Sequence, residues 1–233
     1  KMMVGNNSLH GTAIVMETAT GKIKAIANLG QQKNKDGSIK KDKDGNSVYA
    51  EDLNYGIGKA TEPGSIFKLA TLMSLLEDKY VTINSTVNCE GGVKSFYGLR
   101  IKDSHLGAED ISVKQAFYTS SNVAFAKLAD QYYHTQPSKF INHLHRFRLD
   151  TITGIDIDAA SAKTTIKKPT NRSWANTTIP FMAHGYEELV TPLHMLMLYN
   201  AVANNGKMMK PYLVNAVREY GNDIKTIQPK VLV

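Results

Sequence analysis

The alternation of apolar and polar residues is clearest near the start of the chain. In "GTAIVMETATGKIKAIANL" (11–29), two alternating stretches flank "TATG", whose Gly21 suits a tight reversal. We therefore expect two paired strands within residues 1–30. The next stretch, residues 31–49, interleaves lysines with aspartates and glycines, which predicts a solvated loop.

The segment "EPGSIFKLATLMSLL" (62–76) is apolar around almost its whole circumference after Pro63-Gly64, so it predicts a buried helix. Lys68 is the exception within it. Lysine is among the residues least often buried, and an unpaired ammonium in an apolar site is costly. Ser65 stands three residues earlier, on the same face of the helix. This pairing of a serine with a buried lysine needs a reason other than packing.

The rest of the chain is mainly helical in pattern. Further helices are predicted at 109–133 (two helices interrupted near "TSSN"), 137–149 and 191–206, with Ser112 or Asp110, Pro137, and Thr191-Pro192 near their starts. Residues 150–180 read as irregular. No internal repeat or convincing linker is found. We expect a single domain over residues 1–233, with sheet strands at 1–30, a charged loop at 31–49, a mainly helical part at 62–206, and a strand with a polar tail at 207–233.

Composition narrows the class of protein. The chain has 233 residues, 42% of them hydrophobic, which is enough for one substantial core. No apolar run reaches the ~18 residues that span a bilayer, and the first residues lack a signal-peptide pattern. We expect a soluble body that could be cut from an anchored protein. A single cysteine, Cys89, excludes an internal disulfide.

The net charge of +7 raises the possibility of a nucleic-acid partner. The densest basic run, "KNKDGSIKKDKDGN" (33–46), is interleaved with aspartates, and no aromatic-rich basic motif, zinc spacing or recognition-helix pattern accompanies it. We therefore expect no nucleic-acid partner.

Two Ser-x-x-Lys patterns occur, and their contexts differ. Ser38 and Lys41 lie in the charged loop, where nothing would desolvate a lysine. Ser65 and Lys68 open an apolar helix. One interpretation is an ordinary helix start, in which the serine caps and the lysine extends to water. The other is catalytic: burial disfavours the charged amine, and a neutral Lys68 could take the proton of Ser65 and make it a nucleophile.

Ser120-Ser121-Asn122 stands at the predicted break between two helices. It could be a helix cap. Alternatively, the Ser120 hydroxyl could pass a proton between Lys68 and a leaving group, while the Asn122 amide holds both Lys68 and a substrate amide. The histidines, including His143 and His145, are scattered or lie on different helix faces, so neither a metal site nor a cofactor is expected.

With both motifs in place, the chain resembles the transpeptidase domain of class B penicillin-binding proteins, closest to the septal cell-division type of Bacteroidetes-like bacteria. The resemblance covers most of residues 11–214. It is carried by segments in the family's order: "GTAIVMETATGKIKAIANL", "NYGIGKATEPGSIFKLATLMSLLED", "TSSNVAFAKLA", "TGIDI" and "GYEELVTPLHMLMLYNAVANNGKMMKPYLV".

The resemblance implies a mixed α/β (α+β) fold of the serine β-lactamase and penicillin-binding transpeptidase type, with an antiparallel sheet and an all-helical subdomain. It implies Ser65 as the acylated nucleophile, Lys68 as the base, and Ser120 with Asn122 as the second motif. The implied partners are peptidoglycan stem peptides ending in D-Ala-D-Ala, β-lactam antibiotics and cell-division proteins. The implied location is the periplasmic face of the bacterial inner membrane, with membrane contact only through an anchor outside this chain.

One departure from the family pattern is serious. The third motif, Lys-Thr/Ser-Gly, is absent: Lys163-Thr164-Thr165 and Lys225-Thr226-Ile227 have no glycine. We therefore expect C-terminal strands of the domain to be missing and residues 1–233 alone to be inactive. Two alternatives stay open: a related serine hydrolase or sensor (β-lactamase, D,D-carboxypeptidase or β-lactam receptor), and a non-catalytic cell-division scaffold.

Overall fold

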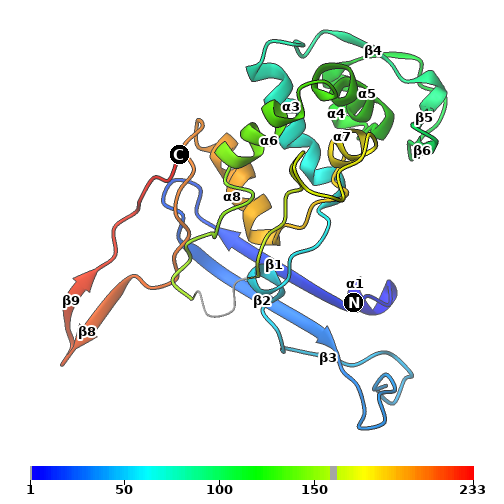
Figure 1. The fold of residues 1–233 in the computed structure, drawn as a ribbon. Coiled ribbons are helices and arrows are strands. Elements are labelled where there is room, and N and C mark those ends of the chain that lie inside the picture. The colour runs from blue at the N-terminus through cyan, green and yellow to red at the C-terminus, as the bar shows by residue number, and fades with distance from the viewer. Residues whose placement is uncertain (1, 158–161) are drawn as a thin grey trace. The chain divides into compact units, whose positions relative to one another are not determined.

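A computed structural model describes residues 2–157 and 162–233 and divides the chain into two compact units (Figure 1). Unit 1 comprises Lys1–Ala60, Ile152–Lys163 and Thr191–Val233, and unit 2 comprises Thr61–Thr151 and Thr164–Val190. The expected single domain over 1–233 stays a prediction.

The sheet of unit 1 is built from β1 (His10–Met16), β2 (Ile23–Gln31) and β3 (Tyr49–Ala50), all antiparallel and in that order. The predicted pair of strands is confirmed, with Ala13 opposite Ala27. At the reversal Gly21 has φ +82°, and a Cβ there would lie 2.3 Å from the Lys210 carbonyl oxygen. Only glycine fits this close approach.

The charged loop between β2 and β3 consists of two successive turns of the same construction. Asn34 and Asp42 each open a turn: the N–H donates to the carbonyl oxygen four residues later, and the carbonyl oxygen accepts from the N–H of the glycine three residues later. The glycines that lie three residues after Asn34 and Asp42 are Gly37 and Gly45, and both have positive φ. The predicted solvated loop is confirmed, but it contains a short internal repeat, which corrects the expectation that the chain has none.

The described residues of unit 1 also form three helices. These are α1 (Met2–Gly5), α2 (Tyr55–Gly58) and α8 (Pro192–Ala203). The α8 start is as predicted, with Thr191 in extended conformation before Pro192. Its apolar side chains pack against β1 and α2.

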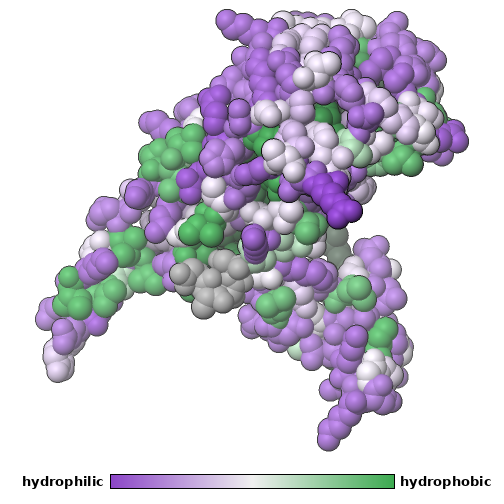
Figure 2. All heavy atoms as spheres, in the orientation of Figure 1, coloured by the Kyte–Doolittle hydropathy of each residue, from purple (hydrophilic) through white to green (hydrophobic). Residues whose placement is uncertain are grey.

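The end of the chain corrects the prediction of one strand followed by a polar tail. Residues after Tyr212 form a hairpin of β8 (Ala216–Glu219) and β9 (Asn222–Thr226), turning at Tyr220-Gly221, both with positive φ. The strands are mostly exposed, and Figure 2 shows apolar residues between polar ones over this arm. Because this hairpin has no buried face, the sequence lacks the alternation that marks a half-buried strand.

The helices of unit 2 carry the residues of the two motifs. They are α3 (Lys68–Glu77), preceded by the 3₁₀ turn η1 (Gly64–Phe67), then α4 (Val113–Tyr118), α5 (Asn122–Tyr133), α6 (Pro137–Arg146) and α7 (Thr178–Met182). Helices α3, α4 and α6 pack against α5, and α7 packs there too. The predicted break between α4 and α5 is confirmed, and Ser112 caps α4 by accepting from the Gln115 N–H. The helix α7 corrects only the end of the stretch 150–180 that was expected to be irregular; its described residues before Thr178 form no helix or strand, and residues 158–161 lie outside the described part of the chain.

Unit 2 also contains two small antiparallel pairs that the sequence analysis did not predict. Strand β4 (Thr86–Asn88) pairs with β7 (Asp110–Ser112), and β5 (Val93–Phe96) pairs with β6 (Leu99–Lys102), after the 3₁₀ turn η2 (Glu90–Gly92). Three- and four-residue strands are too short to give a periodic signal. The end of β6 leads directly to Asp103, beside the second motif.

The overall class is as expected: a mixed α/β architecture with antiparallel sheets and a helical part. Within the described residues, none of the helices has the length and apolar character needed to cross a membrane.

Candidate active site

The turn before α3 presents Ser65 to solvent. Gly64 has φ +61°, a conformation that favours glycine, and its N–H donates to the Gly185 carbonyl oxygen at 2.9 Å. Gly185 itself has φ +97°, and a Cβ there would lie 1.9 Å from the Gly64 carbonyl oxygen. Ser65 follows this contact and is exposed. Two glycines thus fix the position of the serine.

Lys68 is the first residue of α3, and its side chain is only 1% exposed. Its Nζ lies 2.9 Å from Ser65 Oγ, 3.0 Å from Ser120 Oγ and 2.6 Å from Asn122 Oδ1. It also lies 2.9 Å from the Ser120 carbonyl oxygen. The structure therefore brings all four predicted site residues together around one buried amine.

The four oxygens around Lys68 Nζ are not equivalent. The Ser120 carbonyl and the Asn122 amide oxygen can only accept hydrogen bonds, whereas the two serine hydroxyls can also donate. A neutral amine has two N–H groups for the two carbonyl-type oxygens. Its lone pair then points to a hydroxyl. The arrangement suits a lysine that accepts a proton from Ser65 or Ser120.

Adjacent residues of the second motif have different structural roles. Ser121 is the cap of α5: its Oγ accepts from the Ala124 N–H at 3.0 Å. Ser120 has φ +58°, an uncommon conformation for a serine, which turns both its carbonyl and its hydroxyl toward Lys68. The cap interpretation therefore holds for Ser121, while Ser120 and Asn122 are left to contact Lys68.

Burial lowers the pKa of Lys68 to about 8, and the carboxylate of Asp103 opposes this effect. His184 is also buried. Burial and the nearby charge of Lys68 lower its pKa to about 4, so the imidazole is neutral at neutral pH. Both changes lower the amount of positive charge in the site.

Two groups near Lys68 were missed in the sequence. Asp103 and His184 reach it from segments that carry no recognisable motif, 35 residues (103 − 68) and 116 residues (184 − 68) along the chain. His184 lies between two backbone contacts with the helix start: the Ala183 carbonyl accepts from Thr71 Oγ1 at 2.9 Å, and the Gly185 carbonyl accepts from Gly64. No local pattern signals such contacts.

The other Ser-x-x-Lys pattern is not assembled. Ser38 Oγ donates to Asp36 Oδ1 at 2.6 Å, and Lys41 Nζ donates to Ser47 Oγ at 3.1 Å. Ser38 and Lys41 thus have different partners in the exposed loop.

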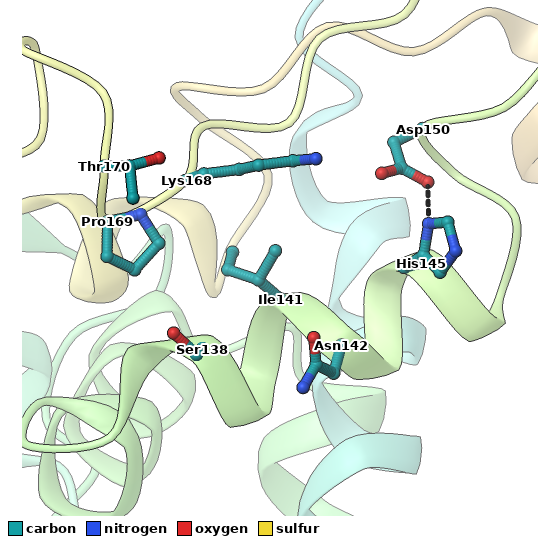
Figure 3. Close-up of a pocket in the computed structure, with 8 residues that line it drawn as sticks. All are labelled: Ser138, Ile141, Asn142, His145, Asp150, Lys168, Pro169 and Thr170. Carbon is teal, nitrogen blue, oxygen red and sulfur yellow. Dashed lines mark hydrogen bonds and ion pairs between the residues drawn. The ribbon is translucent and has the colours of Figure 1, made fainter.

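Unit 2 has a further cavity of about 350 Å³ beside α6 (Figure 3). Its lining comprises Ser138, Ile141, Asn142, His145, Asp150, Lys168, Pro169 and Thr170. Lys168 extends across the cavity above Ile141, toward the His145–Asp150 pair, whose Nδ1 and Oδ1 are 2.9 Å apart. None of the four predicted catalytic residues lines this cavity, and Lys68 is elsewhere in the unit.

The family model described as "Penicillin binding protein transpeptidase domain" matches residues 11–233. Among curated relatives, penicillin-binding protein PbpB of Mycobacterium tuberculosis is 24% identical over 207 residues, which is 88% of this chain and 28% of that protein. The peptidoglycan D,D-transpeptidase FtsI homolog of Mesostigma viride is 22% identical and covers 93% of this chain and 36% of its own length. The chain therefore spans about a third of the length of these relatives.

Among solved structures, the apo TP domain of Burkholderia pseudomallei penicillin-binding protein 3 superimposes with a TM-score of 0.74 at 20% identity. The match covers 97% of this chain and 59% of that one. At this identity the likeness establishes the fold alone.

Proposed function

The chain belongs to the penicillin-binding protein transpeptidase family, and from this premise we propose that it acts as a peptidoglycan D,D-transpeptidase through an acyl-enzyme on Ser65. The observation that carries the proposal is the buried Lys68 amine at 2.9 Å from Ser65 Oγ, in contact with Ser120 and Asn122. Such a pair activates a hydroxyl that is otherwise a weak nucleophile.

The proposed first half-reaction starts from the neutral lysine. Ser65 Oγ attacks the carbonyl carbon of the penultimate D-alanine, and its proton passes to Lys68 Nζ. The peptide C–N bond then breaks. Free D-alanine leaves with a proton delivered from Lys68 through the Ser120 hydroxyl, which leaves an ester on Ser65. The Asn122 amide orients Lys68 and, in this scheme, the substrate amide.

In the second half-reaction the amine of a neighbouring stem peptide attacks the ester carbonyl carbon and loses a proton to Lys68. A new amide C–N bond forms, the ester C–O bond breaks, and Ser65 Oγ regains a proton. A β-lactam would acylate Ser65 in the same way, but its ring-opened product stays attached. We propose septal cell-wall synthesis on the outer face of the cytoplasmic membrane, with cell-division partners and an anchor outside the chain, as the biological setting.

We also propose that residues 1–233 by themselves react slowly. They contain no Lys-Thr-Gly or Lys-Ser-Gly triplet, and in the family this motif contributes to substrate binding. Loss of one oxyanion donor from the strand that carries it would cost about 10²–10³ in rate.

A fluorescent penicillin tests the assignment in the whole protein. We expect covalent label at Ser65, mapped by mass spectrometry, and no label in Ser65→Ala. Ser38→Ala is the matched control and should label normally, because Ser38 is held by Asp36 in the exposed loop. Label that survives Ser65→Ala would refute the choice of nucleophile. Rapid turnover of a chromogenic cephalosporin would indicate a hydrolase instead.

A further inference from the structure

Asp103 is a buried carboxylate directly behind the second motif. It follows the end of β6 and is 6% exposed. Its Oδ2 accepts from Ser121 Oγ at 2.7 Å, and its Oδ1 accepts from the Val123 N–H at 2.9 Å. Hydrogen bonds to a charged acceptor are stronger than neutral ones, so this pair ties the start of α5 firmly to the end of β6.

Lys102, the residue before Asp103, holds Asn122 of the second motif. The Lys102 carbonyl accepts from Asn122 Nδ2 at 2.8 Å, which leaves Asn122 Oδ1 directed at Lys68. Lys102 and Asp103 together thus fix Ser121, Asn122 and Val123. Ser120, in its left-handed conformation, is the residue just before this fixed segment. An uncommon backbone conformation persists only where the surroundings hold it.

Asp103 also faces the charged groups of the site. Its carboxylate favours the ammonium form of Lys68, against the effect of burial. His184, a second titratable group that interacts with Lys68, is neutral at neutral pH. Asp103 also interacts electrostatically with the buried Cys89 thiol, and it lines a cavity of about 190 Å³ together with His105.

We propose that Asp103 is a positioning residue for acyl transfer, which holds the Ser120–Asn122 corner against Lys68 and places a negative charge directly behind that corner. The proposal rests on the proposed function for its kinetic effect. The two roles separate experimentally because one depends on hydrogen bonds and the other on charge.

The experiment measures two quantities against pH in the whole protein: the rate of Ser65 acylation by labelled penicillin, and the titration of Lys68 followed by NMR with ¹³C-labelled lysine, assigned by its absence in Lys68→Arg. Asp103→Asn keeps the size of the side chain but removes its charge, so that the hydrogen bond from Val123 is weakened and the one with Ser121 must reverse its direction. We expect the maximal rate to fall about tenfold and the Lys68 midpoint to move roughly one pH unit lower.

Ser121→Ala separates the two roles. It removes a hydrogen bond to Asp103 without changing charge, so the maximal rate should fall while the Lys68 midpoint stays in place. It also keeps the inference testable if Asp103→Asn does not fold. Asp110→Asn is the matched charge control: Asp110 is exposed and bonds Asn88, so neither quantity should change.

An unchanged rate and midpoint in Asp103→Asn would overturn the inference, as would a midpoint shift in Ser121→Ala equal to that of Asp103→Asn. If the unaltered protein takes no label while the midpoint moves as expected, the proposed function fails and the electrostatic role of Asp103 is supported.

Discussion

Lys68 combines a buried position with acceptor oxygens on several sides, and its pKa near 8 sets the expected pH dependence of acylation. Below this value the neutral fraction of the lysine falls about tenfold per pH unit. We expect the acylation rate to rise from pH 5 to about 8 and then level off.

Lys68→Arg should remove the activity, because a guanidinium stays charged. Stopped-flow or gel-based labelling measures both. Lys127→Arg is the control, because Lys127 is half-buried on α5 and paired with Glu90 at 2.7 Å. A flat profile in the unaltered protein would contradict the role of Lys68 as base.

Glu188 is the most unusual carboxyl group in the described part of the chain. It is fully buried, and neither carboxyl oxygen has a hydrogen-bond partner there. Burial, with Glu62 and Glu187 nearby, raises its pKa well above the usual value. A nearby cation that opposes this effect, Lys167, is bonded to Glu187 at 2.8 Å. The folded protein therefore holds a proton here that the unfolded chain releases.

The sign of the pH effect follows from this difference. Where the folded state binds more protons, the free energy of unfolding falls as pH rises, from the ordinary glutamate range upward to the raised pKa. Glu188→Gln should match the unaltered protein at pH 4 and be more stable at pH 8. A gain of about 1 kcal/mol would raise Tm by roughly 2–4 °C. Thermal unfolding at both pH values measures this, with Glu109→Gln, an exposed position, as control. Equal Tm differences at pH 4 and pH 8 would argue against a neutral buried acid.

At the scale of elements, the contact between the start of η1 and the segment after α7 decides where Ser65 lies. Gly185→Ala would place a Cβ 1.9 Å from the Gly64 carbonyl oxygen, at φ +97°. We expect the free energy of unfolding to fall by about 3 kcal/mol or more. Acylation should also be slower, because the turn that carries Ser65 must move. Gly98→Ala is the matched control. Gly98 has φ +88° but open space around its Cβ, so only backbone strain of about 1–2 kcal/mol should appear. Chemical unfolding measures the free energy of unfolding of both variants. Similar decreases in the two would mean that the close contact between Gly185 and the Gly64 carbonyl is unimportant.

The elements that the sequence predicted well are those with local signals. Strands β1 and β2 alternate on either side of a glycine turn, and α8 opens with Thr191-Pro192. The members of the candidate site could be proposed for the same reason, because each of its two motifs is local in the sequence. Ser65 and Lys68 are three residues apart, and Ser120 and Asn122 are two residues apart. What joins the halves is not local: the Lys68–Asn122 contact spans 54 residues, and Asp103 and Glu188 have no pattern around them. Their environment is set by tertiary packing, which one sequence does not display.

At the scale of the whole molecule, all four proposed catalytic residues belong to unit 2, whose two ends meet. Thr61 and Val190 are its first and last residues, and they exchange two backbone hydrogen bonds of 3.0 Å as an antiparallel bridge. A piece cut at these ends keeps residues 152–163 as a connection, whose closure entropy grows only slowly with length.

We therefore predict that residues 61–190 fold alone and retain the depressed pKa of Lys68. Chemical unfolding followed by circular dichroism should be cooperative, and the NMR titration of Lys68 should keep its midpoint near 8. A control piece, residues 61–175, lacks α7, Gly185 and the Val190 bridge, and should not fold cooperatively. A non-cooperative transition for 61–190, or a Lys68 midpoint near that of a free lysine, would show that the site needs unit 1 to form.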